Sequence, residues 1–401
     1  MTHWLSVIGI GDDGFCGLSP AARTLVLSAQ TLVGGARHLA MVPPSAAERL
    51  QWRQPLAATI PDIEARRGSP LAVLASGDPL WYGVGVVLLR HFRRDEMTIL
   101  PQPSAFSLAA ARLGWPIAEC TTLSLHARPL DELRLHLAPR ARLLLLSEDG
   151  ATPAAVARLL TSCGWGPSRI SVFEHLGGAS ERATHRSAQE WGDKRAADLN
   201  LVALECAPAP GTRVLPRTAG LPDDAFEHDG QLTKREVRAA TLARLAPMPG
   251  ETLWDIGAGS GSVAIEWLRA GGGAAVAVER EPRRAALIAR NAATLGVPRL
   301  EIVVGDAPAA VAGLPPPEAI FVGGGLAAGG MLEALWPALT PGGRLVANVV
   351  SAEGERVVLE WQARFGGDLS RLAISRCEPL GGRHAWRPLM SVTQLAATKP
   401  L

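Results

Sequence analysis

Short apolar runs alternate with amphipathic stretches along the first half of the chain. The apolar runs predict strands at 5–10, 71–75, 143–146, 170–174 and 201–205. The amphipathic stretches predict helices at 21–29, 84–92, 105–113 and 153–160. Ser19 and Pro20 have the residue types expected at the cap and first turn of the first helix. Because strands that alternate with helices favour parallel sheets, we predict an α/β unit.

The second half has the same alternation. We expect strands at 252–256, 274–279, 301–304, 319–322 and 344–349, and helices at 233–245, 262–270, 282–295 and around 331–335. Thr233 is the expected N-cap of the first of these helices, because Glu236 follows at the capping-box spacing. The segment Ala-Pro-Ala-Pro-Gly at 207–211 fits neither a helix nor a central strand. We therefore predict one domain at 1–206, a linker at 207–212 and a second domain at 213–401.

Composition narrows the range of partners. The 401 residues carry 40 basic and 38 acidic side chains, a net charge of +2, which disfavours a dedicated nucleic-acid binder. No apolar run reaches the ~18 residues of a membrane-spanning helix, and the N-terminus lacks the pattern of a signal peptide. The five cysteines are scattered without a C-x-x-C pair, so we expect reduced thiols, no metal site and a cytoplasmic protein.

A glycine-rich turn in the second half is the first chemical signal. Residues 255–261 spell D-I-G-A-G-S-G between a predicted strand and a predicted helix. Gly257, Gly259 and Gly261 permit a tight turn and close approach of a nucleotide-type ligand to the backbone. The spacing differs from G-x-G-x-x-G, which disfavours a dehydrogenase.

Further residues follow at the ends of the next strands. Glu279 ends one strand, where an acid can accept hydrogen bonds from ribose hydroxyls. Asp306 and Ala307 end the following strand in a G-D-A motif, next to an expected adenine edge. With Asp255, F-V-G-G-G-L at 321–326 and P-G-G-R-L at 341–345, this series resembles class I S-adenosylmethionine-dependent methyltransferases.

The segment before the turn makes the resemblance more specific. T-K-R-E-V-R at 233–238 precedes L-W-D-I-G-A-G, a combination similar to CbiT-like domains, which methylate and decarboxylate a corrin precursor in cobalamin biosynthesis. The match covers about 213–390. It implies that Thr233 contributes to the cofactor site and that Lys234 is a catalytic candidate.

The first half resembles another family. Residues 7–14 spell V-I-G-I-G-D-D-G, residues 75–83 A-S-G-D-P-L-W-Y-G and residues 124–129 S-L-H-A-R-P. Together they resemble class III tetrapyrrole methyltransferases of the CbiE-like branch. The resemblance implies a set of cofactor-lining residues: Gly77, Asp78, Tyr82, Gly83 and Ser104. It also makes His126 and Arg128 catalytic candidates facing the macrocycle, although His126 could equally be a structural histidine.

The two resemblances together imply a bifunctional enzyme. The fold class is α/β: an N-terminal class III tetrapyrrole-methylase fold of two subdomains, then a C-terminal class I Rossmann-like fold. The implied reaction is S-adenosylmethionine-dependent methylation of a precorrin, assigned to carbon 5 for the first domain and carbon 15 for the second, with loss of an acetate carboxyl. We expect two cofactor sites per chain, no nucleic acid, no membrane, and a homotetramer formed through the C-terminal domain.

Alternatives remain open from the residues alone. The chain could be a methyltransferase acting on RNA or a small metabolite, or a non-catalytic carrier of corrinoid intermediates. All but three of the 40 basic residues are arginine, an excess that we attribute mainly to genome composition. Some arginines are candidates for gripping the carboxylate arms of the substrate: Arg235, Arg238, Arg280 and Arg383.

Overall fold

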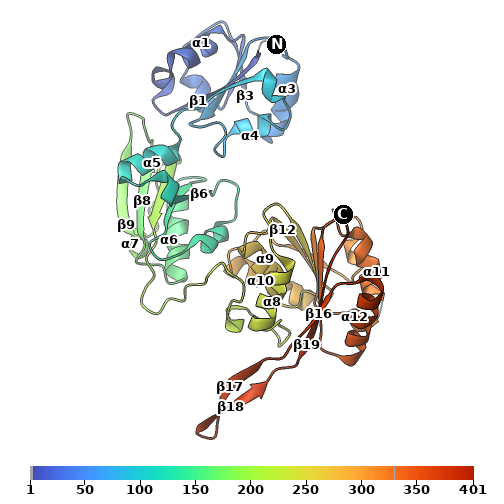
Figure 1. The fold of residues 1–401 in the computed structure, drawn as a ribbon. Helices are drawn as coiled ribbons and strands as arrows, with labels where there is room; N and C mark the ends of the chain where they lie inside the picture. The colour runs from blue at the N-terminus through green and yellow to red at the C-terminus, as the bar shows by residue number, and fades with distance from the viewer. Residues whose placement is uncertain (1–2, 329) are drawn as a thin grey trace. The chain divides into compact units, whose positions relative to one another are not determined.

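A five-stranded parallel sheet begins the chain. Figure 1 shows the computed structural model, which describes residues 3–328 and 330–401. The strand order is β3-β2-β4-β1-β5, formed by β1 (Leu5–Ile10), β2 (Thr31–Gly34), β3 (Glu48–Gln51), β4 (Leu71–Ser76) and β5 (Met97–Leu100). Apolar clusters fill both faces of the sheet under helices α1 (Pro20–Ser28), α2 (Ala36–Ala40), α3 (Ile60–Glu64) and α4 (Val84–Leu88).

A second five-stranded sheet follows, and it differs from the prediction. Its order is β6-β7-β10-β8-β9, with β6 (Cys120–Ser124), β7 (Arg142–Leu146), β8 (Arg169–Glu174), β9 (Arg182–Ser187) and β10 (Asn200–Glu205). Only β6 and β7 are parallel, and the other pairings are antiparallel. The prediction of a parallel sheet was wrong here. Strand β9 follows β8 without a helix between them, so the two strands pair directly and antiparallel. The helices of this part are α5 (Ala105–Leu113), α6 (Thr152–Ser162) and α7 (Ala188–Trp191).

A seven-stranded sheet forms the C-terminal part. Its order is β13-β12-β11-β14-β15-β19-β16, with β11 (Thr252–Ile256), β12 (Ala274–Glu279), β13 (Glu301–Val304), β14 (Ala319–Val322), β15 (Arg344–Val349), β16 (Asp368–Leu372) and β19 (Val392–Thr398). Strand β19 runs antiparallel to both β15 and β16.

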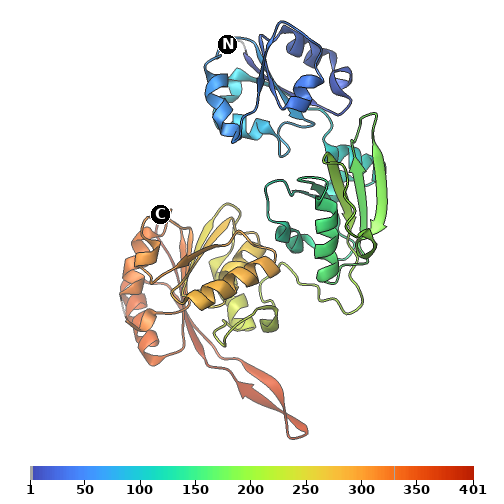
Figure 2. The same cartoon turned by 180° about the vertical axis from the view of Figure 1, so that it is seen from behind.

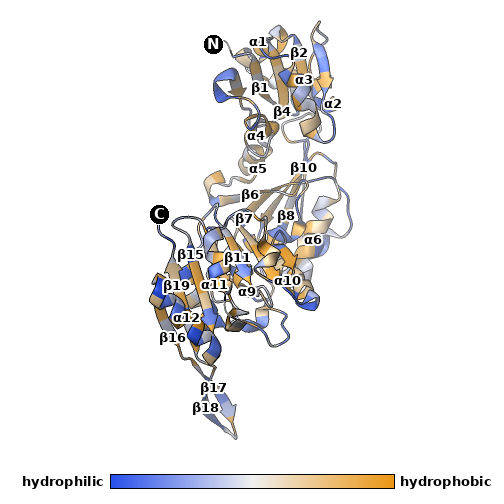
Figure 3. Ribbon diagram, turned by 90° about the vertical axis from the view of Figure 1, so that its right-hand side faces the viewer, coloured by the Kyte–Doolittle hydropathy of each residue, from blue (hydrophilic) through white to orange (hydrophobic). Residues whose placement is uncertain are grey.

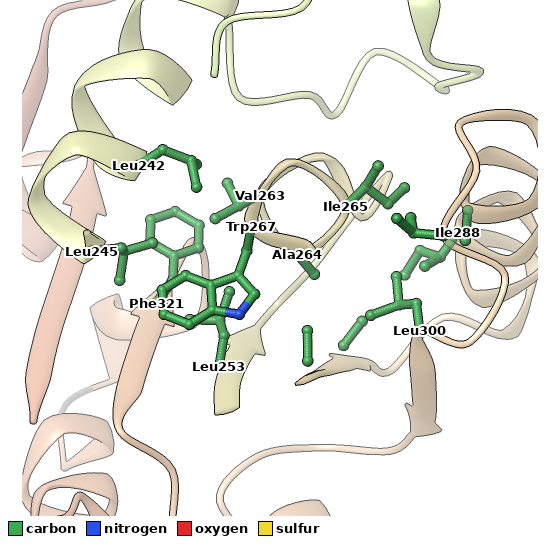
Figure 4. Close-up of a cluster of buried hydrophobic side chains, with 14 of the residues drawn as sticks. Leu242, Leu245, Leu253, Val263, Ala264, Ile265, Trp267, Ile288, Leu300 and Phe321 are labelled. Carbon is green, nitrogen blue, oxygen red and sulfur yellow. The ribbon is translucent and has the colours of Figure 1, made fainter. Parts of the chain in front are cut away.

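Helices cover both faces of this sheet. One face packs against α8 (Arg235–Leu245), α9 (Ser262–Arg269) and α10 (Pro282–Thr294), and the other against α11 (Met331–Leu335) and α12 (Ala352–Phe365). Figure 4 shows the first interface, where Trp267 and Val263 of α9 lie against Leu253 and Phe321 of the sheet. The buried core therefore fixes the carboxyl ends of the parallel strands, where the glycine-rich turn lies.

A two-stranded hairpin extends from the C-terminal sheet. Strands β17 (Ser375–Leu380) and β18 (Arg383–Pro388) pair only with each other among the described residues. Figures 1 and 2 show the hairpin projecting from its sheet. Figure 3 contrasts its largely polar strands with the hydrophobic central strands.

The chain divides into two units by its internal contacts. The N-terminal unit comprises Met1–Leu130 and His136–Arg213, and the C-terminal unit comprises Asp131–Leu135 and Val214–Leu401. The segment 207–212 lies at the end of the N-terminal unit, where the Ala209 N–H donates to the Gly164 carbonyl over 2.8 Å.

Most predicted elements are present within a residue or two, but two helices differ. Helix α4 ends at Leu88 rather than at 92. Helix α8 begins at Arg235 after Lys234 as N-cap, so Thr233 is not the cap. The expected capping box does not form, because the Glu236 carboxylate instead pairs with Arg376 over 2.7 Å. None of the helices in the described part of the chain is long and apolar enough to cross a membrane.

Candidate functional site

The glycine-rich turn lies between β11 and α9 and has a strained path that only glycine adopts freely. Gly257, Gly259 and Gly261 have φ angles of +70°, +59° and +75°. The N–H groups of Gly257 and Ala258 both donate to the Val278 carbonyl over 3.0 Å, which fastens the turn to β12. A Cβ at Gly257 would lie 3.2 Å from the Gly324 nitrogen, so the backbone of the next loop passes close by.

Asp255 lies beneath this turn rather than at its surface. Its side chain is buried, and Oδ2 accepts the Ala264 N–H over 2.9 Å while Oδ1 has no partner in the structure. Burial, and secondarily the charge of Glu279, raises the pKa of Asp255 to about 7. Asp255 and Gly261 do not line the adjoining cavity. Gly261 instead allows close helix packing, since a Cβ there would meet Ile288 at 2.7 Å.

Glu279 ends β12 and is fixed by the backbone. Its Oε2 accepts the Gly259 N–H over 2.8 Å, and its Oε1 accepts the Glu281 N–H over 3.0 Å. The carboxylate is buried at 4% exposure yet lines the cavity. Each oxygen retains a further lone pair, so the carboxylate can still accept hydrogen bonds from a bound diol.

The other predicted cofactor residues of this half meet at the same cavity. Asp306 and Ala307 follow β13, and Thr233 and Lys234 precede α8. The cavity of about 810 Å³ opens where the parallel strands end, and it is lined by all four residues together with Gly257, Gly259 and Glu279. Its size lies within the range of small-molecule sites.

The far side of the cavity is formed by different elements. Asn348 and Val350 lie at the end of β15, and Glu378 and Arg387 come from the two strands of the hairpin. These four residues were not predicted as site residues. The hairpin strands carry too little apolar periodicity for a sequence pattern to place them here.

The arginine candidates of the C-terminal unit separate into different roles. Arg280 lines the cavity. Arg238 is completely buried, donates to Glu266 over 2.6 Å and stacks on Phe226 with 4.7 Å to the ring centroid. Arg238, one of the candidates for gripping substrate, is therefore neither a substrate contact nor a solvated surface charge, because its guanidinium is committed to the interior. Arg235 and Arg383 are exposed and do not line the cavity.

In the N-terminal unit, the G-D-P turn joins β4 to α4. Gly77 has a φ of +54°, and a Cβ there would lie 3.0 Å from the Ser104 Cα. Asp78 Oδ1 accepts the Leu80 N–H over 2.8 Å, an Asx-type turn. Gly83 is the N-cap of α4, and Ser104 is the N-cap of α5, accepting the Ser107 N–H over 3.2 Å.

Tyr82 links this turn to the second sheet. Its φ is +58°, unusual for a residue with a side chain, and its hydroxyl donates to the Thr122 carbonyl over 3.0 Å. The Arg128 guanidinium lies 5.0 Å from the Tyr82 ring centroid. His126 is exposed in the same loop as Arg128. The structure thus brings Gly77 next to Ser104 and Tyr82 next to Arg128.

A polar cluster beside the first glycine loop was not predicted. Asp12 accepts from Arg37 over 2.8 Å and lies 3.2 Å from His175 Nδ1, while Ser76 lies 2.9 Å from His38 Nε2. Burial, and secondarily Arg37, lowers the pKa of His38 to about 4.

Comparisons with known proteins match the N-terminal and C-terminal parts of the chain to two different family models. The model described as tetrapyrrole (corrin/porphyrin) methylases matches residues 5–191, and the model described as a precorrin methyltransferase domain matches residues 224–399. A precorrin-6Y C(5,15)-methyltransferase [decarboxylating] of Sinorhizobium sp is 52% identical over 100% of this chain and 97% of its own length.

Two shorter relatives from Salmonella typhimurium are also similar. A cobalt-precorrin-7 C(5)-methyltransferase is 33% identical over 44% of this chain and 88% of its own length. A cobalt-precorrin-6B C(15)-methyltransferase (decarboxylating) is 35% identical over 42% of this chain and 89% of its own length.

Proposed function

The chain belongs to the family of decarboxylating precorrin-6Y C5,15-methyltransferases, and we propose from this that it methylates a corrin precursor of cobalamin twice and removes one acetate carboxyl. The observation that carries the proposal is full-length similarity combined with two separate methyltransferase units, each with its glycine turn intact. The RNA methyltransferase and the non-catalytic carrier gain no support from either family model.

We propose that the N-terminal unit methylates carbon 5 and that the C-terminal unit methylates carbon 15 and decarboxylates. The similarity to two separate enzymes of Salmonella typhimurium, named for carbon 5 and for carbon 15, supports this division. The boundary between the units after Arg213 is consistent with a catalytic domain on either side of 207–212.

The C-terminal cavity is the better-defined cofactor site. S-adenosylmethionine, when bound, supplies an activated methyl group. Glu279 and Asp306 would hold its ribose and adenine, while the open turn at Gly257 and Gly259 leaves room for close backbone approach. The residues present fit such a ligand, because a buried carboxylate with spare lone pairs faces a cavity of about 810 Å³.

A second cofactor site is proposed in the N-terminal unit. Gly77, Asp78, Tyr82, Gly83 and Ser104 would line it, as the family resemblance implies. The close approach of Gly77 to Ser104 and the left-handed backbone at Tyr82 support a specialised turn at this place. Arg128 and His126 would face the macrocycle on the neighbouring loop.

The protein's contribution to methyl transfer is mainly positioning. The bridge carbons of a reduced tetrapyrrole are already electron-rich, so alignment and exclusion of water can supply most of the rate enhancement. Lys234 lines the C-terminal cavity and is the proposed cation beside the substrate carboxylates. For decarboxylation, the conjugated macrocycle accepts the electron pair of the broken bond.

We further propose a homo-oligomer, a tetramer formed through the C-terminal unit, that works in the cytoplasm without nucleic acid or membrane partners. The hairpin β17–β18 supports the first part, because Trp386 is 73% exposed, Leu380 67% and the adjacent Met390 76%. By the register of the hairpin, Leu380 and Trp386 lie on opposite faces, so each face presents one large exposed apolar side chain that a neighbouring copy would cover in the proposed assembly.

Two measurements on the full chain test the main proposal. Mass spectrometry of the reacted precorrin should show a gain of two methyl groups and the loss of one carbon dioxide. Equilibrium dialysis with labelled S-adenosylmethionine should show two sites per chain. A chain that binds no cofactor, or leaves the precorrin unchanged, would contradict the proposal.

A further inference from the structure

A buried polar network meets the C-terminal cavity at Asn348. Asn348 of β15 stands directly opposite Gln394 of β19 in the antiparallel register. Thr241 of α8 lies against both: its Oγ1 is 2.9 Å from Asn348 Nδ2 and 3.1 Å from Gln394 Nε2. Thr241 and Gln394 are buried, at 0% and 2% exposure, whereas Asn348 is half-buried and lines the cavity.

The chemistry of Thr241 fixes the orientation of both amides. Its single hydroxyl proton is donated to the Val237 carbonyl over 2.9 Å, so its oxygen can only accept from other partners. Both neighbouring amides must therefore turn their nitrogens toward it. Gln394 Nε2 also donates to Asn348 Oδ1 over 2.9 Å. One N–H and one oxygen lone pair of Asn348 remain for a ligand.

Three valines share the cavity wall with this carboxamide, beside the charged Glu378 and Arg387. Val237, Val350 and Val392 line the same cavity, and Val237 and Val392 are themselves buried. Asn348 lies on β15, whereas Glu279 ends β12 and Asp306 follows β13, on the other side of β11 and its glycine-rich turn. Asn348 thus belongs to the half of the cavity that the proposed cofactor residues leave open.

We propose that Asn348 binds the acetate carboxylate that leaves as carbon dioxide, and that Thr241 and Gln394 act as its positioning residues. This inference rests on the proposed function of the C-terminal unit. The ligand group is a carboxylate on a macrocycle, and the remaining Asn348 N–H donates to one of its oxygens.

A neutral amide suits a carboxylate that has to lose its charge. The Asn348 N–H orients the carboxylate without placing a full positive charge beside it. A guanidinium adds ion pairing and a second parallel hydrogen bond, which strengthen binding of the charged ground state and do not accelerate its reaction. In the step itself, the bond between the acetate methylene and the carboxyl carbon breaks. Its electron pair enters the cationic macrocycle produced by methylation, carbon dioxide leaves, and the methylene carbon then takes a proton from water.

Three variants of the full chain test this inference. In Asn348→Leu, decarboxylation should slow at least about tenfold, the equivalent of one lost hydrogen bond to a charged group, and methylated tetrapyrrole that retains its carboxyl should accumulate. Thr241→Val removes the acceptor that orients the amide and should give the same product. Thr241→Ser keeps the hydroxyl and should restore decarboxylation.

The readouts separate orientation from general damage. Binding of labelled S-adenosylmethionine and the thermal unfolding midpoint should be the same in Thr241→Val and Thr241→Ser, while the ratio of carboxyl-retaining to decarboxylated product differs. Equal ratios in these two variants would overturn the inference, even if Asn348→Leu failed to fold. Wild-type protein that releases no carbon dioxide would instead overturn the proposed function.

Discussion

At the scale of single residues, Asp255 is an acid that folding keeps largely protonated below neutral pH. Its pKa is about 7 in the folded chain against 3.8 for the ordinary group. The folded state therefore binds the proton more tightly, and stability falls as pH rises from about 4 to about 7, then changes no further. The shift corresponds to about 4 kcal/mol. This loss of stability concerns the C-terminal unit, whose core surrounds Asp255.

Asp255→Asn should remove this pH dependence. The amide oxygen can still accept the Ala264 N–H, and no charge is buried at high pH. We expect the thermal unfolding midpoint of the variant, relative to wild type, to rise between pH 5 and pH 8. Asp306→Asn, at an exposed position, is the control and should leave the dependence unchanged. Parallel curves for Asp255→Asn and wild type would contradict the assignment.

At the scale of elements, the pair Arg238–Glu266 joins α8 to α9. Glu266 also accepts the Gly220 and Leu221 N–H groups over 2.6 and 2.9 Å, so this one carboxylate fixes the preceding loop as well. Arg238→Met would leave the buried carboxylate without its cation, and we expect a loss of about 3–5 kcal/mol in the free energy of unfolding.

Urea unfolding followed by circular dichroism measures this loss. The matched control is Arg356→Met, which breaks the exposed pair with Glu360 inside α12 at 2.7 Å. Exposed pairs of this spacing are worth about 0.3–0.5 kcal/mol. Similar losses of unfolding free energy in the two variants would contradict a dominant role of the Arg238–Glu266 pair in holding α8 in place.

The start of α9 depends on the absence of a side chain at Gly261. Gly261→Ala combines a φ of +75° with a Cβ only 2.7 Å from Ile288 of α10, whereas Gly271→Ala has a φ of +106° with no atom within 4 Å. Both variants bear backbone strain of roughly 1–2 kcal/mol, and only the first also forces α9 and α10 apart. We expect Gly261→Ala to unfold at the lower temperature in calorimetry, and the reverse order would contradict this packing.

At the scale of the whole molecule, two units imply two separable activities. Asp78→Asn removes a charge in the N-terminal unit while its oxygen can still accept the Leu80 N–H. Glu279→Gln removes a charge in the C-terminal unit and also leaves one of the two backbone N–H groups on Glu279 without an acceptor. We expect each variant to lose one of two cofactor sites, with affinity there falling by about tenfold or more. Mass spectrometry should show different single-methyl products, and loss of the same methyl in both would contradict the division.

Local patterns explain what could be predicted and what could not. The turn at 255–261 and the strand ending at Glu279 follow from a parallel strand–helix repeat, which is encoded within a few residues. Strand β9, with its mostly exposed R-A-T-H-R-S sequence, has no apolar periodicity to reveal it. The contact of Asn348 with Gln394 depends on the register of an antiparallel strand that no local pattern specified. Arg238 resembled a surface charge because its burial depends on Glu266 in another helix.

In the proposed assembly, the hairpin β17–β18 would make the C-terminal site sensitive to enzyme concentration. Glu378 and Arg387 of its two strands form part of the cavity wall, while Trp386 and Leu380 expose apolar surface. An isolated two-stranded ribbon is only marginally stable, so under the proposed assembly neighbouring copies would hold this wall in place. Turnover at carbon 15, per mole of chain, should therefore fall on serial dilution while turnover at carbon 5 stays constant. Activity assays across a dilution series would show the difference between the two turnover rates. If both rates stayed constant, the hairpin would keep its position in a single chain without neighbouring copies.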